Sequence, residues 1–286
     1  MSSLEKNYLT CKALARQIDK DRYLSVLFAP KDRRRYLFAL SAFNFEVARI
    51  RDQITEPMMG EVRLQWWRDA VERKTAGEAS RGPVADALAD TISLFGLPRA
   101  RFHELIDART FDLYNDPMPT LAQFEIYLDF TSASLIRLAV QIIGGPETPK
   151  INQTAIHAGR AYAIFGLLRS FARHASRGQV YVPLEVLDRH GATRDDVISG
   201  RPTEGVKRAL REMRDLARLH IMEAQKRMVS LPENVLPAFM HVEMVPNYLT
   251  HMEKRGYDPF VAPVQLPQLL RPWIIWRAAK RLGSRR

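Results

Sequence analysis

The chain has 286 residues, of which 46% are hydrophobic and 26% charged, an ordinary balance for a globular protein with a large core. Its single cysteine, Cys11, excludes an internal disulfide framework and fits a reducing compartment. The formal net charge of +11 favours anionic partners. Basic residues are scattered among acidic ones and no nucleic-acid-binding motif occurs, so nucleic acid is the least favoured of these partners.

No run of the sequence approaches 18 consecutive apolar residues, and we therefore expect no transmembrane helix. The N-terminal segment contains Glu5, Asp19 and Asp21 and lacks an apolar stretch, which argues against both a secretory signal and a transit peptide. The sequence predicts a cytoplasmic protein, peripheral on the inner face of a bacterial cytoplasmic membrane.

Apolar residues recur every three or four positions along most of the chain, which predicts amphipathic helices. Helices are expected over 32–54, 62–76, 84–95, 98–114, 120–143, 148–175, 204–231 and 235–254. Alternating strand patterns and Asn-Gly hairpin turns are absent from the sequence. The expected fold is therefore all-α, with one helical domain over 1–265 and a basic, Trp-containing tail over 266–286.

Two segments carry a recognisable pattern. "ALSAFNFEVARIRD" (39–52) and "GRAYAIFGLLRSFARHASRGQVYVP" (159–183) resemble the two aspartate-rich helices of the squalene/phytoene synthase family. "LQWW" (64–67), "PVADAL" (83–88) and "FHELIDARTFDL" (102–113) are similar to the family's intervening helices in order and spacing. The resemblance covers roughly residues 8–265 and implies an isoprenoid synthase-like helical bundle with a central cavity.

In that family, carboxylates spaced four residues apart hold magnesium ions, and the magnesium ions hold the diphosphate of the substrate. The positions that match these carboxylates here are Ala48, Asp52, Ser170 and His174, so three of the four carboxylates are missing. Magnesium prefers oxygen ligands, and we therefore expect no metal site, no cofactor and no synthase reaction. A fold that is kept while its metal ligands are lost is typical of a pseudoenzyme.

The segments "AFNFEVARIRD", "LQWW" and "SRGQVYVP" are also similar to the phytoene synthase-like group of complex I assembly factors, which share alanine at the position of Ala48. This resemblance implies a role in assembling NADH:ubiquinone oxidoreductase, with complex I subunits or other assembly factors as partners. One alternative is an active, magnesium-dependent prenyltransferase that makes squalene or phytoene from two prenyl diphosphates. Another is a protein that binds an isoprenoid or other lipid in the former cavity.

The roles of the single acid and the histidine remain open at this point. Asp52 is either a surviving metal ligand or a solvated or arginine-paired residue, and the nearby Arg49 and Arg51 favour the second interpretation. His174 has no second histidine four residues away, so we expect it to line a polar cavity rather than to bind a metal.

Arginines replace acids around the second motif. Arg169, Arg173 and Arg177 recur at four-residue intervals and either grip an anionic head group directly or form a solvated stripe. Arg169 and Tyr181 still match the family pattern, whereas Arg49 and Arg173 stand where the family often has acids. The candidate residues for lining a cavity or binding an anion are Arg49, Arg169, Arg173 and Tyr181.

The C-terminal segment "LLRPWIIWRAAKRLGSRR" (269–286) mixes tryptophans with basic residues. This combination suits an anionic membrane interface, although a tail packed on the core would also use tryptophan. The residues expected to contact a membrane are Trp273, Trp276, Arg277, Lys280 and Arg281.

Overall fold

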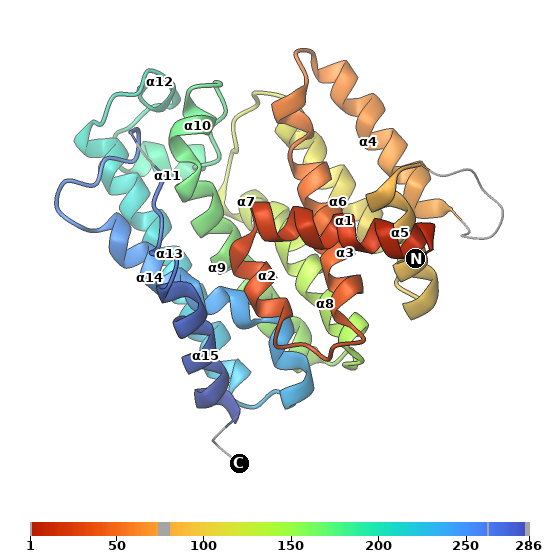
Figure 1. Cartoon of the computed structure of the whole chain (residues 1–286). Helices are drawn as coiled ribbons and strands as arrows, with labels where there is room; N and C mark the ends of the chain where they lie inside the picture. The colour runs from red at the N-terminus through yellow and green to blue at the C-terminus, as the bar shows by residue number, and fades with distance from the viewer. Residues whose placement is uncertain (1, 74–80, 262, 284–286) are drawn as a thin grey trace.

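The computed structural model describes residues 2–73, 81–261 and 263–283. Within these ranges every regular element is a helix and no strand occurs, as the sequence predicted (Figure 1). The α-helices are α1 (Ser3–Ile18), α2 (Lys20–Val26), α3 (Arg34–Ala48), α4 (Pro57–Glu72), α5 (Pro83–Phe95), α6 (Arg99–Ala108), α7 (Leu121–Leu128), α8 (Ser134–Ile143), α9 (Pro149–Arg169), α10 (Phe171–Ala175), α11 (Leu184–Arg189), α12 (Arg194–Ile198), α13 (Glu204–Met228), α14 (Val245–Met252) and α15 (Leu270–Gly283). Shorter 3₁₀ segments are η1 (Ile50–Gln53), η2 (Arg109–Leu113), η4 (Glu233–Ala238) and η5 (Met240–Met244), and η3 (Asp129–Ala133) is a π segment.

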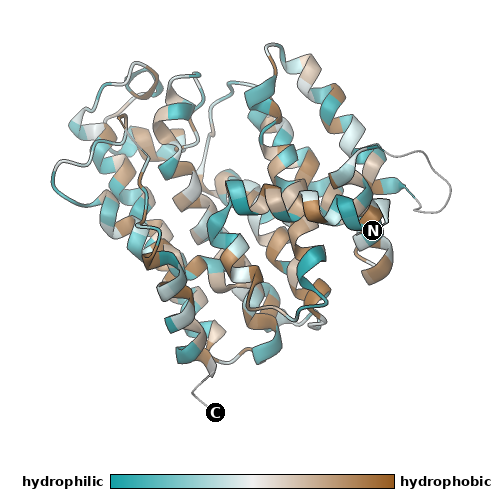
Figure 2. Cartoon of the chain, in the orientation of Figure 1, coloured by the Kyte–Doolittle hydropathy of each residue, from teal (hydrophilic) through white to brown (hydrophobic). Residues whose placement is uncertain are grey.

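The helices surround one continuous apolar core. The two longest helices, α9 and α13, pack along one another, and α1 lies across α3 and α5 in the view of Figure 1. In Figure 2 hydrophobic residues concentrate where helices face one another, and hydrophilic residues concentrate on the outer turns. The core therefore holds α3, α8 and α9 side by side at the centre of the bundle.

The first expected helix, over 32–54, is shorter in the structure and ends in a tighter turn. Helix α3 ends at Ala48, and the 3₁₀ segment η1 continues the chain. Ile50 and Ile54 remain buried, so the apolar stripe survives the change of geometry. A pattern of apolar residues cannot distinguish a 3₁₀ ending from another turn of α-helix. As a result, Asp52 lies in the turn that follows α3 and not on the helix itself.

The helix expected over 148–175 is divided at Ser170. The backbone there has φ −96° and ψ 9°, which separates α9 from the short helix α10. Thr148 caps the start of α9 by accepting a hydrogen bond from the backbone N–H of Ile151. Both motif segments therefore change direction close to the residues that matched the family's metal-binding positions.

Residues 121–143 form an almost unbroken helical run of α7, η3 and α8. By length and composition this run is apolar enough to cross a membrane, with a mean hydropathy of 1.4 over its most apolar stretch. Of that stretch, 67% is buried inside the fold. Asp129 and Arg137 interrupt its apolar residues, which is why a search for unbroken apolar runs does not find it. Its place in the core accounts for its apolar character.

The helix expected over 235–254 is wrong in its first half. Two 3₁₀ segments, η4 and η5, occupy that half, and α14 begins only at Val245. Pro237 lies inside η4 and Pro246 lies in the first turn of α14. Proline has no N–H to donate and clashes with the preceding helical turn, so a continuous α-helix cannot form here. Residues 74–76 of the helix expected over 62–76 lie outside the described residues.

The C-terminal segment forms helix α15, which packs on α2 and η5. Its packed face consists of Ile274, Ile275, Ala278 and Leu282. Arg271 adds an ion pair, at 3.6 Å, to the buried carboxylate of Asp21 in α2. This segment is therefore joined to the helical domain by both apolar and charged contacts. Residues 284–286 of the expected tail lie outside the described residues.

Helix α9 passes very close to the π segment η3 at Gly159. A Cβ atom at Gly159 would lie 2.5 Å from backbone atoms of Ala133, whereas a Cβ atom at Gly166 of the same helix would meet nothing within 4 Å. The two glycines therefore offer a matched pair of positions, one crowded and one open.

We expect Gly159→Ala to lower the free energy of unfolding by about 1–3 kcal/mol, because the backbones of α9 and η3 must move apart. Gly166→Ala is the control, and since alanine is favoured over glycine in helices by up to about 1 kcal/mol, it should leave stability unchanged or raise it. Urea unfolding followed by circular dichroism measures both effects. A Gly159→Ala variant as stable as the natural chain would contradict the close approach.

Candidate functional site

An open pocket of about 250 Å³ lies where the two motif segments meet. The end of α3 and η1 form one part of its wall, and α9 and α10 form another, with α2, η2 and η3 completing it. Ala48, Asp52, Ser170 and His174 all line this pocket. The fold thus brings together the four positions that the sequence singled out, although they come from two distant segments.

Asp52, the remaining carboxylate of the two motifs, is bound by arginines of the facing segment. Its Oδ2 atom lies 3.2 Å from Nη1 of Arg173, and its Oδ1 atom accepts a hydrogen bond from Arg177. Arg49, one of the two partners favoured from the sequence, pairs instead with Glu46 one turn earlier and does not line the pocket. Opposite charges therefore join η1 directly to α10 and the turn after it.

The positions of Ser170 and His174 offer no negative charge. The His174 ring packs edge-on against Tyr181, with ring centroids 4.9 Å apart. Burial, together with the positive charge of Arg173, lowers the pKa of His174 to about 4. The imidazole is therefore neutral at pH 7, and the Ser170 hydroxyl is uncharged.

This set of residues does not fit a magnesium cluster. Magnesium requires several oxygen ligands in near-octahedral geometry, whereas Ala48 supplies none and Asp52 already has two guanidinium partners. Among the described residues, no three His, Cys, Asp or Glu side chains are grouped so that they could hold a metal ion. The chemistry of the pocket wall favours anions over cations.

A buried carboxylate, Asp112, organises one side of the pocket wall. It accepts hydrogen bonds from the hydroxyl groups of Tyr127 and Tyr181 at 2.8 and 2.7 Å and from Arg109 at 2.9 Å. Burial, and then the Asp112 charge, raise the pKa of Tyr181 well above its ordinary value, so this candidate residue stays protonated and committed to Asp112. Asp112 could not be picked out from the sequence, because its two tyrosine partners come from distant segments of the chain.

Three more arginines reach the pocket, the predicted Arg169 together with Arg22 and Arg51. The Arg169 guanidinium lies 5.1 Å from the ring centroid of Phe165 and 6.0 Å from that of Tyr248. Burial acts to lower the pKa of Arg169, but nearby groups, Tyr162 first among them, raise it overall. Arg22 lies over the Tyr162 ring at 5.2 Å. Aromatic rings therefore hold the guanidinium groups of Arg22 and Arg169, and Arg22 also forms an ion pair at 3.5 Å with Asp19.

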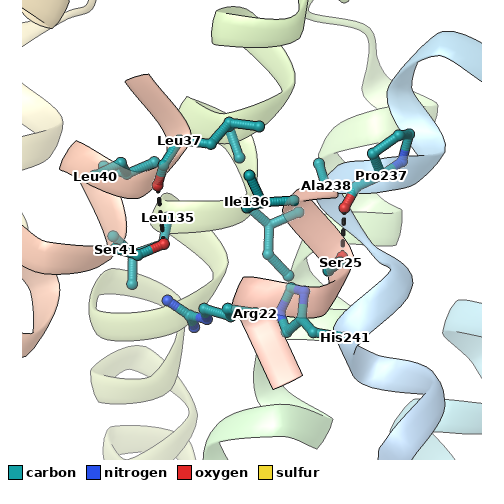
Figure 3. Close-up of a pocket in the computed structure, with 12 residues that line it drawn as sticks. Arg22, Ser25, Leu37, Leu40, Ser41, Leu135, Ile136, Pro237, Ala238 and His241 are labelled. Carbon is teal, nitrogen blue, oxygen red and sulfur yellow. Dashed lines mark hydrogen bonds between the residues drawn. The ribbon is translucent and has the colours of Figure 1, made fainter. Parts of the chain in front are cut away.

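Two small apolar pockets adjoin the polar one. The first, of about 40 Å³, opens beside Arg22, with His241 at its edge (Figure 3). Its apolar wall includes Leu37, Leu40, Leu135 and Ile136. The second, of about 20 Å³, shares His174 and Tyr181 with the polar pocket. The polar pocket is thus the main open space of the site, with little apolar volume attached to it.

Helix α15 presents the residues that were expected to contact a membrane. Trp273 and Trp276 are each 49% exposed. The Arg277 guanidinium lies 5.3 Å from the centroid of the Trp273 ring, and the Lys280 ammonium lies 4.4 Å from that of Trp276. Arg281, in contrast, forms an ion pair at 2.7 Å with the buried Glu243. Four of the five candidates therefore share an exposed face, while Arg281 helps to attach the helix to the core.

Known proteins resemble this chain over nearly its whole length. Residues 15–273 match the squalene/phytoene synthase family. The chain is 29% identical over 266 residues to NADH dehydrogenase (ubiquinone) complex I, assembly factor 6, of Mus musculus, which covers 93% of this chain and 80% of that protein. It is 26% identical over 260 residues to the presqualene diphosphate synthase of Sinorhizobium fredii, covering 90% of this chain and 92% of that one.

Solved structures resemble the fold as well. The squalene synthase of Alicyclobacillus acidocaldarius superimposes with a TM-score of 0.77 at 24% sequence identity, covering 90% of this chain and 97% of that one. This likeness confirms the isoprenoid synthase-like helical bundle that the sequence predicted. At this level of identity it says nothing about the chemistry of the pocket.

The lowered pKa of His174 should make the fold less stable in mild acid. The imidazole has a pKa of about 6.5 in the unfolded chain and of about 4 in the folded protein. Between these values the unfolded chain binds more protons, so the free energy of unfolding falls as the pH drops from about 6.5 toward 4. His174→Asn should make this decrease shallower, as measured by urea unfolding between pH 7 and pH 5. An unchanged slope would contradict a buried, neutral His174.

Proposed function

The chain belongs to the squalene/phytoene synthase family, and we propose that it is a non-catalytic member that acts as an assembly factor for respiratory complex I. The observation that carries this proposal is the pairing of Asp52 with Arg173 and Arg177, which occupies the one motif carboxylate that a metal could use. The likeness to complex I, assembly factor 6, over 93% of the chain supports the assembly role. No cofactor is proposed.

The main alternative is an active head-to-head prenyltransferase that condenses two prenyl diphosphates. The likeness to presqualene diphosphate synthase, at 26% identity, is its support. That reaction needs magnesium to hold and release diphosphate, and Ala48, Ser170 and neutral His174 are poor ligands for it. A second alternative is a protein that binds an isoprenoid or other lipid.

An exposed stripe on α4 is the surface that best suits a protein partner. Met58, Val62 and Trp66 recur at four-residue intervals and are 69%, 65% and 38% exposed, and Met59 beside them is 51% exposed. Apolar side chains that gather on one exposed helix face are typical of protein–protein contact sites. We propose that this stripe, Met58, Met59, Val62 and Trp66, contacts a complex I subunit or another assembly factor.

We expect a tagged chain, expressed in its native host, to capture complex I subunits or other assembly factors that mass spectrometry can identify. Met58→Asp combined with Val62→Asp should reduce this capture at least about tenfold, because two buried charges without partners would cost several kcal/mol at an apolar interface. Met222→Asp on α13, where the side chain is 63% exposed, is the control and should capture as the natural chain does.

The same preparation separates the assembly role from the prenyltransferase alternative. Purified protein incubated with farnesyl diphosphate and magnesium should release no more diphosphate than a heat-denatured sample. Robust product formation without capture of complex I proteins would sink the assembly role and favour the enzyme.

We further propose that α15 attaches the protein peripherally to the inner, cytoplasmic face of an anionic membrane. Exposed tryptophan rings such as those of Trp273 and Trp276 lie favourably at the level of the lipid head groups. Arg277 and Lys280 share this face, and each basic residue near an anionic surface contributes about 1 kcal/mol. Such an attachment would raise the concentration of an assembly factor where a membrane complex is built.

Co-sedimentation with cardiolipin-containing vesicles should fall as salt is raised, since salt screens the basic residues. It should fall further for Trp273→Ser combined with Trp276→Ser. Both side chains lie on the exposed face, so the buried Ile275 and Leu282 still hold α15 in place.

A control variant separates membrane contact from a general loss of exposed apolar surface. Leu9→Ser combined with Leu94→Ser removes two leucines, 51% and 58% exposed, from α1 and α5. This control should sediment as the natural chain does. If the tryptophan variant also sediments unchanged, α15 is packed structure and not a membrane contact.

A further inference from the structure

Several buried polar atoms of the pocket wall lack a hydrogen-bond partner within the described part of the chain. They are Arg22 Nε, Arg51 Nε, Arg109 Nε, Asn44 Oδ1 and Ser132 Oγ. Of these, Arg22 Nε forms an ion pair at 3.5 Å with Asp19. Ser132 is only 5% exposed, and its hydroxyl belongs to the π segment η3. A buried polar group without a hydrogen bond destabilises a fold, so several around one pocket point to a polar ligand.

The charge of the pocket wall indicates the sign of that ligand. Five arginines line the pocket against three aspartates. Arg22, Arg109 and Arg173 are paired with the three aspartates of the same wall. Arg51 and Arg169, in contrast, make no ion pair or hydrogen bond to any described residue, and neutral His174 adds no charge. The pocket therefore carries positive charge that is free to meet an anion.

We propose that this pocket binds a small phosphoryl anion, of the phosphate or diphosphate class, through Arg51 and Arg169 and without a metal ion. Guanidinium groups present fixed pairs of N–H donors that match the oxygens of a phosphoryl group. The Ser132 hydroxyl can donate a hydrogen bond to the same anion. Anion binding of this kind is independent of the role in complex I assembly, so either can fail without the other.

The dimensions of the site favour a free anion over one that carries a long chain. The polar pocket of about 250 Å³ can hold several groups the size of water, whose share of liquid volume is about 30 Å³. The adjoining apolar pockets of about 40 and 20 Å³ each hold about one such group. Figure 3 shows Leu37, Leu135 and Ile136 along the wall of the larger of these two pockets, beside Arg22. An isoprenyl chain does not fit either one.

The effect of magnesium distinguishes this site from one built on carboxylates. Where carboxylates hold metal ions, magnesium is required for diphosphate to bind. Here the arginines meet the anion directly, and magnesium would only compete by binding the anion in solution. We therefore expect magnesium to weaken binding.

Isothermal titration calorimetry of the full chain with inorganic diphosphate, in the presence of EDTA, tests the proposal. Binding should be measurable without metal and should weaken when excess magnesium replaces EDTA. Farnesyl diphosphate, titrated in EDTA, should bind no more tightly than inorganic diphosphate. Clearly tighter binding of farnesyl diphosphate would identify a phosphorylated lipid as the ligand and overturn the assignment to a free anion.

Three variants and a control locate the binding. Arg51→Gln and Arg169→Gln should each weaken diphosphate binding roughly ten- to hundredfold, the loss expected for charge-assisted hydrogen bonds. Asp52→Asn should strengthen it, because the change frees Arg173 and Arg177. Arg211→Gln, which removes the same charge from an exposed position on α13, should have no effect beyond about twofold.

Several titration results would overturn the proposal. Absence of binding in EDTA, or binding only with magnesium, would overturn the proposal. Equal weakening by Arg211→Gln would show a general attraction to positive charge and would also overturn it. Circular dichroism checks that each variant folds. If Arg169→Gln does not fold, Arg51→Gln and Asp52→Asn carry the test, since Asp52 is 32% exposed.

Discussion

The contact between α9 and η3 fixes the position of the pocket. Gly159 lets the two backbones touch at Ala133, where a Cβ atom would collide. From that contact α9 runs on to Arg169 and Ser170, and η3 turns Ser132 toward the same pocket. The π segment adds one residue to the helical turn and so changes which side chains face α9. The end of α9 therefore lines the same pocket as the end of α3.

The arginines around the second motif affect the ligand that the pocket can bind more than they affect the stability of the fold. Arg173, Arg177 and Asp52 are 54%, 39% and 32% exposed, and ion pairs this open to water contribute little to the free energy of unfolding. Their effect lies in the ligand that the pocket accepts. The pocket wall carries an excess of guanidinium groups, held in place by aromatic rings and by Asp112. The charge of this wall is set by side chains that the apolar core does not need.

Local sequence patterns predicted the all-helical fold, and family spacing predicted which four positions would share a pocket. The breaks at Ala48 and Ser170 could not be predicted, because apolar periodicity continues through both. The true partners of Asp52 were also out of reach, since a neighbour in sequence such as Arg51 is easily preferred to one that only folding brings close. Arg22 and Asp112 needed the tertiary structure for the same reason.

The pocket and the apolar stripe of α4 are both positioned by the segments η1 and η2. A Cβ atom at Gly60 in α4 would lie 2.7 Å from Ile54, just after η1, and 2.5 Å from Leu113 at the end of η2. These two segments carry the arginines and aspartates on one side of the pocket. Because contacts this close leave little room between the segments, α4, η1 and η2 hold one another in position. The apolar stripe and this side of the pocket therefore belong to one tightly packed part of the fold.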